Sequence, residues 1–272
     1  MSILPTSRQS GDGNNMGAID MCNYQISINR HAIAHTLITV IALLLGASLL
    51  GQISRYEFGH DYVYGLVQLF NVDAERNIPT FFTVLLAAIG AMLLTVIGLA
   101  GKPREKNDGP YWFALAAGFL FLGYDEAFQV HEQLIAPMRG LMGNANMGVF
   151  YFGWVIPGIA GVCILALFFV KFLLRLPAST RHWLLFSGAL YLGGAIGMEL
   201  IDGKYIEAHG ENLMYSVLVT IEEGLELSGL ATLIYTLLGH IAEASPKVEF
   251  HVHTAAQPAL AAQPEYNPAA SR

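Results

Sequence analysis

Long apolar stretches alternate with short polar segments along most of the 272-residue chain. A helix needs about 20 apolar residues to cross a bilayer core about 30 Å thick. Six stretches have this length, at approximately 32–54, 80–101, 110–134, 149–175, 181–202 and 213–240. The pattern therefore predicts an all-α fold: a polytopic membrane protein that is a bundle of six transmembrane helices.

The two ends of the chain lack this apolar pattern. The first is polar and rich in Gly and Asn, and the last is rich in Ala, Pro and Gln. Such segments bury too little apolar surface to fold alone. We therefore expect three parts: a flexible cytoplasmic tail at 1–24, a six-helix membrane domain at 25–242, and a flexible cytoplasmic tail at 243–272. The start does not resemble a cleavable signal peptide.

The distribution of Lys and Arg predicts the orientation of these helices. Basic residues precede the first apolar stretch and fill the segments after the second and fourth stretches, whereas the other loops contain few. Cytoplasmic loops carry an excess of Lys and Arg. Both termini are thus predicted in the cytoplasm, and the loops 55–79, 135–148 and 203–212 are predicted outside.

Composition narrows the class of protein further. Charged residues make up only 13% of the chain and hydrophobic residues 54%, whereas a soluble domain has about 25% charged residues. The predicted partner is the lipid bilayer. There is no basic patch with interleaved aromatic residues, so we expect no nucleic acid partner. Cys22 and Cys163 form no metal-binding or disulfide pattern. Oligomerisation is left open.

Ionisable side chains interrupt three of the predicted spans, beginning with the segment GYDEAFQVHE at 123–132. In the predicted topology they all lie between the midplane and the outer surface. They are Asp125, Glu126, His131, Glu132, Glu199, Asp202, Glu222, Glu223 and Glu226. An acid at a helix centre costs about 2.5–3.5 kcal/mol on insertion. Among Lys and Arg, only Lys204 and Arg139 lie near, at the edges, so a bound cation or shared protons must compensate.

Helical spacing predicts which of these side chains share a face. In the third span, Asp125, Gln129 and Glu132 fall on one side at about 100° per residue. The sixth span carries a second set on one arc: Tyr215, Glu222, Glu223 and Glu226. We expect one site if the third, fifth and sixth spans are neighbours.

The fifth span combines a packing face with a chemical face. Ala189, Gly193 and Gly197 recur at four-residue steps and form a small-residue stripe that suits tight helix packing. Glu199 and Asp202 project approximately opposite this stripe. One side of the helix is therefore predicted to pack, and the other to face the site.

The 55–79 loop precedes the second span on the predicted outer side. It contains Asp73, Glu75, Arg76 and Asn77. One interpretation is a lid over the acidic site, because irregular loops on a site face often carry function. The other is that Asn77 and Pro79 simply begin the next helix.

Four histidines, His31, His35, His182 and His240, fall near the predicted cytoplasmic interface. Histidines on two helices at equal depth could hold a haem. Interfacial imidazoles that reach toward water are the favoured interpretation.

Three segments carry a resemblance to a known family: NVDAERNIPTFF, FLGYDEAFQVHE and the double Glu of the last span. They resemble a family of bacterial multi-pass membrane proteins that is uncharacterised. The resemblance covers most of the membrane region and implies a location in the bacterial inner membrane. It implies no activity.

The acidic cluster leads to three hypotheses about function. The first is ion- or proton-coupled transport, in which the cluster binds a divalent cation or relays protons, with Glu222, Glu223 and Glu226 as central groups. The second is a metal-dependent membrane enzyme, a hydrolase or oxidoreductase with a lipid-like substrate, in which Glu222 or Glu223 acts as the catalytic base. Its metal would be Zn, Fe, Mn or Mg. The third is a non-catalytic subunit or scaffold. The sequence does not decide whether the protein is an enzyme.

Overall fold

The computed structural model describes residues 3–5, 24–26, 29–100, 108–143 and 146–244. Most of the two predicted tails lies outside these ranges. The strands β1 (Ile3–Pro5) and β2 (Tyr24–Ile26) form one antiparallel pair. All other regular elements in the described part are helical. The long helices are α1 (Arg30–Phe58), α3 (Ile78–Ala100), α4 (Gly109–Phe128), α6 (Val155–Arg175), α7 (Ala178–Leu192), α8 (Glu199–His209) and α9 (Leu213–Ala244).

Short helical segments occupy the connections. They are η1 (Val63–Gly65), α2 (Leu66–Phe70), η3 (Glu132–Leu134), α5 (Ile135–Leu141) and η4 (Gly148–Phe150). A π-helical turn, η5 (Gly193–Met198), joins α7 to α8, so that 178–209 form one continuous helical rod. In the described part of the bundle, both the long elements and most of their connections are therefore helical.

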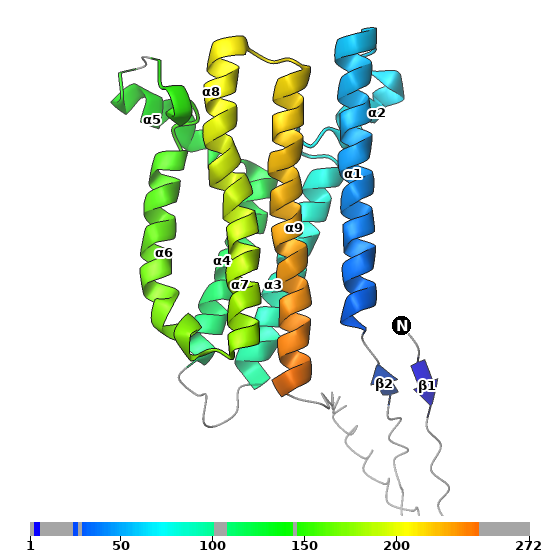
Figure 1. Cartoon of the computed structure of the whole chain (residues 1–272), viewed down its shortest axis with the longest axis vertical. Coiled ribbons are helices and arrows are strands. Elements are labelled where there is room, and N and C mark those ends of the chain that lie inside the picture. Colours follow the sequence, from blue (N-terminus) through cyan, green and yellow to red (C-terminus); the bar gives the residue numbers. More distant parts are fainter. Residues whose placement is uncertain (1–2, 6–23, 27–28, 101–107, 144–145, 245–272) are drawn as a thin grey trace, which may run out of the picture.

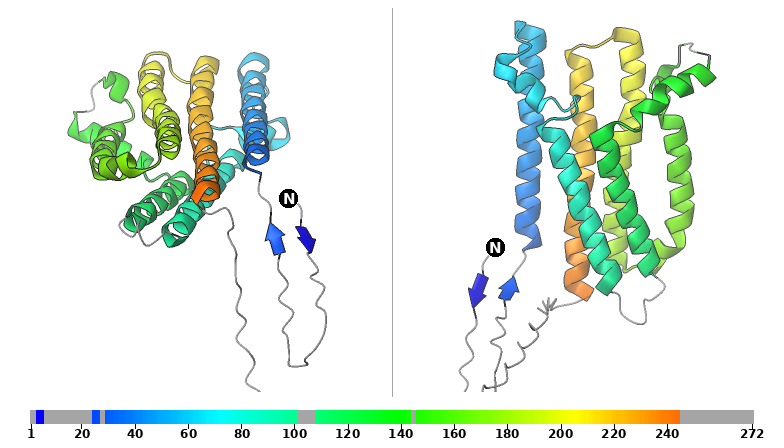
Figure 2. Two further views of the ribbon diagram at one scale, coloured as in Figure 1. Left: turned by 60° about the horizontal axis from the view of Figure 1, so that its bottom comes forward. Right: turned by 180° about the vertical axis from the view of Figure 1, so that it is seen from behind.

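Consecutive long helices run antiparallel, and α9 lies between α1 and the α7–α8 rod, with α3 and α4 behind it (Figures 1 and 2). The connections that contain α2, α5 and the α8–α9 turn lie at one end of the bundle, which we call the α5 end. The start of α1 and the finish of α9 lie at the other, which we call the Arg30 end. The loops that were predicted to share one side of the membrane therefore do lie at one end.

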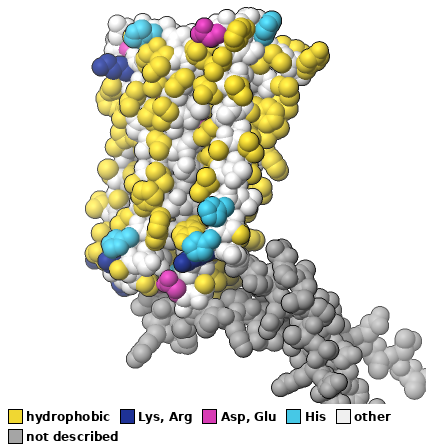
Figure 3. All heavy atoms as spheres, turned by 45° about the vertical axis from the view of Figure 1, so that its right-hand side comes forward, with side chains coloured by type: hydrophobic (Ala, Val, Ile, Leu, Met, Phe, Trp, Pro, Cys, Tyr) yellow, Lys and Arg dark blue, Asp and Glu magenta, His cyan; other side chains and the backbone are white. Residues whose placement is uncertain are grey.

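Four helical segments in the described ranges are long and apolar enough to cross a membrane: Arg30–Phe58, Ile78–Ala100, Val155–Arg175 and Ala178–His209. Apolar side chains cover the middle of the face drawn in Figure 3, and charged and His side chains lie toward its two ends. These features are consistent with a membrane protein. The acid-bearing helices α4 and α9 are not among the four, so the count of six spans stays a prediction.

Helix α9 forms the centre of the core. Leu227, Leu230 and Leu237 are at most 2% exposed, and they pack in two apolar clusters with side chains of α1, α3, α4 and α6. The Ser187 hydroxyl donates to the Gly229 carbonyl at 2.8 Å and ties α7 to α9. Within a bilayer such contacts stabilise helix pairing through close packing rather than through removal of apolar surface from water. The core thus fixes the helices that carry the acids.

Helix α4 ends earlier than the apolar pattern predicts. Gln129 adopts a left-handed conformation with φ of 54° and ends the helix after Phe128. Glu132 consequently belongs to the following turn of 3-10 helix, η3. The prediction that Asp125, Gln129 and Glu132 share one helical face is therefore wrong, because the chain leaves the helix between them.

The small-residue stripe of the fifth span is also displaced. A side chain added at Gly193 would meet open space, whereas a Cβ at Gly194 would lie 2.7 Å from the Glu222 carbonyl oxygen. The π-helical turn has more residues per turn than an α-helix, so it shifts which glycine faces α9. The close contact occurs at Gly194 rather than along Ala189, Gly193 and Gly197.

Candidate functional site

The end of α4 folds back on itself around Asp125. Its Oδ1 accepts from the His131 backbone N–H at 2.8 Å, and its Oδ2 lies 2.8 Å from His131 Nδ1. This arrangement depends on the left-handed Gln129, which turns the chain so that residues six apart meet. The side chains are 19% and 28% exposed for Asp125 and His131. The result is a carboxylate–imidazole pair at the edge of the bundle.

The environment of His131 favours its charged form. Burial opposes the imidazolium, but the hydrogen bond and negative charge of Asp125 outweigh this, and Glu199 and Glu132 add to them. The pKa of His131 therefore lies above its ordinary value of about 6.5. The charged form of His131 is thus favoured at the entrance to an otherwise acidic region.

Trp154 connects the Asp125–His131 pair to the α7–α8 rod. Its ring centroid lies 4.8 Å from that of His131, and its indole N–H donates to Glu199 Oε1 at 2.8 Å. The segment before Trp154 is held in place by Glu207, whose carboxylate accepts from the Met147 and Gly148 backbone N–H groups at 2.8 and 2.7 Å. Trp154 therefore bridges the α4 end and α8.

Deeper in the bundle, carboxyl groups of α4 and α9 interact with one another. Electrostatic interactions link Glu126 to Glu223 and Glu226. Glu226 also interacts with the side chain of Tyr191, from α7, and with His131. The acids from two predicted spans therefore converge, and the hydroxyl of a third helix joins them.

Asp202 and Glu222 form the most buried part of the site. Asp202 is 1% exposed and Glu222 is 9% exposed. The Glu222 carboxyl interacts with those of Glu199 and Asp202, and neither Asp202 oxygen has a hydrogen bond of good geometry from a described residue. A buried carboxylate without a donor is costly. Neutral, protonated carboxyls would remove this cost.

The π-helical turn makes these contacts possible. Gly194 lies within the turn and against α9, where a Cβ would come 2.7 Å from both the Glu222 carbonyl oxygen and Glu226 Cγ. No larger residue fits there without moving the backbone that carries both acids. The absence of a side chain at Gly194 thus lets α9 approach the α7–α8 rod at the level of the site.

The loop at 71–77 lies beside the site, where Asp73 interacts electrostatically with Glu132 and Glu199. The Ser48 hydroxyl accepts from the Val72 N–H at 3.1 Å, and Gln52 Nε2 donates to Asn71 Oδ1 at 2.7 Å, so α1 holds the loop. Asn77 Oδ1 accepts from the Thr80 N–H at 3.1 Å. The prediction that Asn77 begins the next helix is therefore confirmed.

The same loop also adds a titratable group to the cluster. Glu75 interacts with Gln129, Glu132 and His131. Burial and the charge of Glu132 raise the pKa of Glu75 to about 7. A raised carboxyl pKa means that the stability Glu75 provides is present at pH below about 4.5 and is lost as the pH rises through about 7. Glu75 is thus positioned to change charge near neutral pH.

The structure brings most of the predicted site residues together. Acids of the α7–α8 rod interact with acids of α9: Glu199 and Asp202 with Glu222, Glu223 and Glu226. The end of α4 and the turn after it add Asp125, Glu126 and His131. Glu132 is exposed and lies at the rim. The two edge cations do not enter: Arg139 lies 4.5 Å over the Tyr151 ring, and Lys204 is exposed.

Several contributors were not predicted as site residues. They are Tyr191, Glu207 and Trp154. Trp154 lies far from its partners in sequence, so only the fold could reveal its role. The one available signal for Tyr191 was its position two residues before the Gly193–Gly194 pair.

No three His, Cys, Asp or Glu side chains in the described ranges are arranged as a metal site. The carboxyls instead interact electrostatically in a connected set, in which Glu222 and Glu223 each interact with several other acids. The predicted divalent metal therefore stays a prediction.

The fold and site together define a class: a helical bundle with a carboxyl-rich region between its helices and, within the described residues, four apolar helices of membrane length. Residues 35–240 match a family described as a domain of unknown function, DUF8692, and the chain belongs to that family. No curated protein and no solved structure matches the chain. The predicted membership of an uncharacterised family is confirmed, whereas a bacterial origin stays a prediction.

Replacing Asp125 by asparagine should lower the pKa of His131, because the variant removes the negative charge and keeps the shape. The raised pKa means that the Asp125–His131 interaction stabilises the fold fully below about pH 6.5. This contribution is lost as the pH rises through the folded-state value. The loss of stability in the variant should therefore be largest in acid and should shrink toward alkaline pH. Histidine NMR signals, assigned with His131→Gln, would measure the pKa directly.

Glu132→Gln provides the matched control, because Glu132 is exposed and its charge is screened by solvent. It should move the pKa of His131 less than Asp125→Asn does. An equal pKa in the wild type and in Asp125→Asn would contradict the assigned pairing.

Proposed function

We propose that the protein is an integral membrane protein that relays protons through the carboxyl/His cluster in ion- or proton-coupled transport. The observation that carries this proposal is the electrostatic interaction among acids from α4, α8 and α9, with Asp202 1% exposed. Carboxyls packed together in a region of low dielectric cannot all ionise. They hold protons or a cation, and a shared proton needs no fixed three-ligand geometry.

The order of the groups supports a relay rather than a single binding point. Glu132 is exposed at the rim, and His131 and Asp125 follow at 28% and 19% exposed. Glu126 then connects to Glu226 and Glu223. Protons would enter from the α5 end and reach the middle of the bundle through groups that differ in exposure. Ionisable residues at membrane depth commonly form such chains.

An apolar layer lies beyond the acids toward the Arg30 end. Leu227, Leu230, Ile234 and Leu237 of α9 are at most 3% exposed. A proton that reaches Glu226 must wait for this layer to open. We therefore propose a transporter with a gated step rather than an open proton channel, in a bacterial inner membrane with both termini in the cytoplasm.

Proton flux in liposomes tests the proposal. The purified protein is reconstituted with a pH-sensitive dye inside the vesicles, and a potassium gradient with valinomycin imposes a membrane potential. We expect flux above that of protein-free vesicles, with a rate that saturates as the potential rises. Metal analysis of the same preparation separates the rival function. A stoichiometric transition metal that is lost in Glu223→Gln, without proton flux, would favour the metal-dependent enzyme and contradict the relay.

A further inference from the structure

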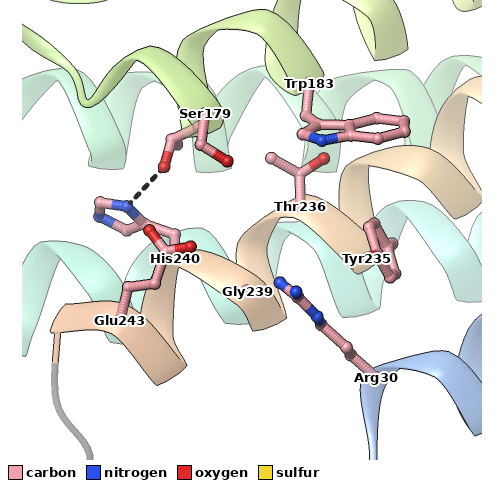
Figure 4. A pocket seen from close by; sticks show the side chains of 9 residues that line it. Arg30, Ser179, Trp183, Tyr235, Thr236, Gly239, His240 and Glu243 are labelled. Atoms are coloured by element: carbon pink, nitrogen blue, oxygen red, sulfur yellow. Dashed lines mark hydrogen bonds between the residues drawn. The ribbon is translucent and has the colours of Figure 1, made fainter.

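A second polar region lies at the Arg30 end, away from the carboxyl cluster. It is a pocket between α1, α7 and α9 with a volume of about 50 Å³ (Figure 4). One water needs about 10–15 Å³ measured in this way, so the pocket holds roughly three to five water-sized groups. That is the size of a tetrahedral anion with four oxygens.

Arg30 supplies positive charge to this pocket. Its guanidinium lies 5.0 Å over the Tyr235 ring and points from α1 toward Gly239 of α9 (Figure 4). A Cβ at Gly239 would collide with Arg30 Nη1, so glycine at this position makes room for the guanidinium. Arg30 takes part in neither of the ion pairs found among the described residues. Among the described residues, no carboxylate is paired with its N–H donors, which can therefore bind an anion.

The opposite wall offers hydroxyl and imidazole groups. Ser179 and Thr180 are first-turn residues of α7, whose N-terminus has no side-chain cap. Thr180 is 4% exposed, and its hydroxyl lies 3.1 Å from His240 Nδ1. His240 also lies against the Trp112 ring at 5.3 Å, which fixes its place in the wall. Hydroxyls and free amides at a helix start add favourable dipoles for an anion bound by Arg30.

We propose that this pocket binds a phosphate group, either of an anionic phospholipid or of a free phosphate ion. A guanidinium opposite hydroxyls matches the geometry of phosphate oxygens. Trp183, which also lines the pocket, is 44% exposed, as expected for an aromatic residue at a membrane interface. Glu243 lies at the mouth and repels the anion, so it weakens binding. The site is separate from the proposed proton relay and does not depend on it.

Binding by the purified full-length protein in a neutral detergent tests this site. Native mass spectrometry would count retained phosphatidylglycerol against phosphatidylcholine, and calorimetry would measure inorganic phosphate. Arg30→Gln should weaken binding about tenfold or more, since a hydrogen bond to a charged group contributes about 1.5–3 kcal/mol. Lys171→Gln is the control, because Lys171 is exposed at the same end and outside the pocket. It should bind like the wild type.

Two further variants keep the test decisive if Arg30→Gln folds poorly. Gly239→Ala retains all charges but displaces the guanidinium, and alanine favours the helix, so it should weaken binding similarly. Glu243→Gln should strengthen binding. Retention of phosphatidylglycerol alone identifies a lipid headgroup, and binding of inorganic phosphate identifies the free ion. Equal binding by wild type, Arg30→Gln and Gly239→Ala, or no preference for phosphatidylglycerol together with no phosphate binding, overturns the proposal.

Discussion

Gly194→Ala should lower the melting temperature of the protein by about 5 °C or more. The added Cβ would lie 2.7 Å from both the Glu222 carbonyl oxygen and Glu226 Cγ. Overpacking of this kind costs about 1–3 kcal/mol, and 1 kcal/mol shifts the melting temperature by about 2–4 °C in a chain of this size. Because one of the colliding atoms belongs to the backbone, rotation of a side chain cannot relieve the contact. Thermal unfolding followed by circular dichroism in detergent would measure the change.

The neighbouring glycine provides the matched control. Gly193 lies in the same π-helical turn, but a Cβ there would have no atom within 4 Å. Gly193→Ala should leave the melting temperature unchanged or raise it slightly, since alanine restricts the unfolded chain. Similar melting temperatures for the two variants would show that α9 does not approach the rod at Gly194.

Glu226→Gln should reduce proton flux in liposomes by about 100-fold. The amide keeps the size of the side chain and its capacity for hydrogen bonds, but it cannot take up and release a proton. Positioned proton-transfer groups contribute about 10²–10⁴-fold to rates in enzymes. Glu226 lies where the interactions from Glu126, Glu223 and Tyr191 meet, so the substitution removes a proton acceptor at the centre of the cluster.

The control for this loss is Glu57→Gln. Glu57 is an exposed acid at the last turn of α1, on the α5 end of the bundle. It contributes a similar surface charge but no contact with the cluster, so its flux should equal that of the wild type. Equal flux in Glu226→Gln and Glu57→Gln would place the proton path elsewhere.

The helices could be predicted from the sequence because they depend on runs of apolar residues. The convergence of the acids could be predicted because each acid interrupts such a run. Runs of apolar residues predict helices of membrane length, and acids are so costly inside such runs that they must share a compensating partner. The deduced orientation then placed Glu126, Glu199 and Glu226 at one depth, and the structure brings them into interaction. The number of spans in a membrane is still a prediction.

The details that shape the site could not be predicted in this way. The break at Gln129, with φ of 54°, brings His131 back to the Asp125 carboxylate, and no Gly or Pro in the sequence indicates it. The π-helical turn changes which glycine faces α9, from Gly193 to Gly194. The four-residue spacing of Ala189, Gly193 and Gly197 in the sequence does not reveal this change. The bond from Trp154 to Glu199 joins residues 45 apart in the chain, so it exists only once the helices have packed.

Infrared spectroscopy of the carboxyl groups tests the central claim most directly. Protonated carboxylic acids and ionised carboxylates absorb at different frequencies, and hydrogen–deuterium exchange identifies the protonated ones. If the acids of α4, α8 and α9 share protons, the wild type at pH 7 shows protonated carboxyls that diminish in Glu222→Gln and Glu226→Gln but persist in Glu57→Gln. A spectrum at pH 7 that contains ionised carboxylates alone, unchanged by all three substitutions, would contradict the account.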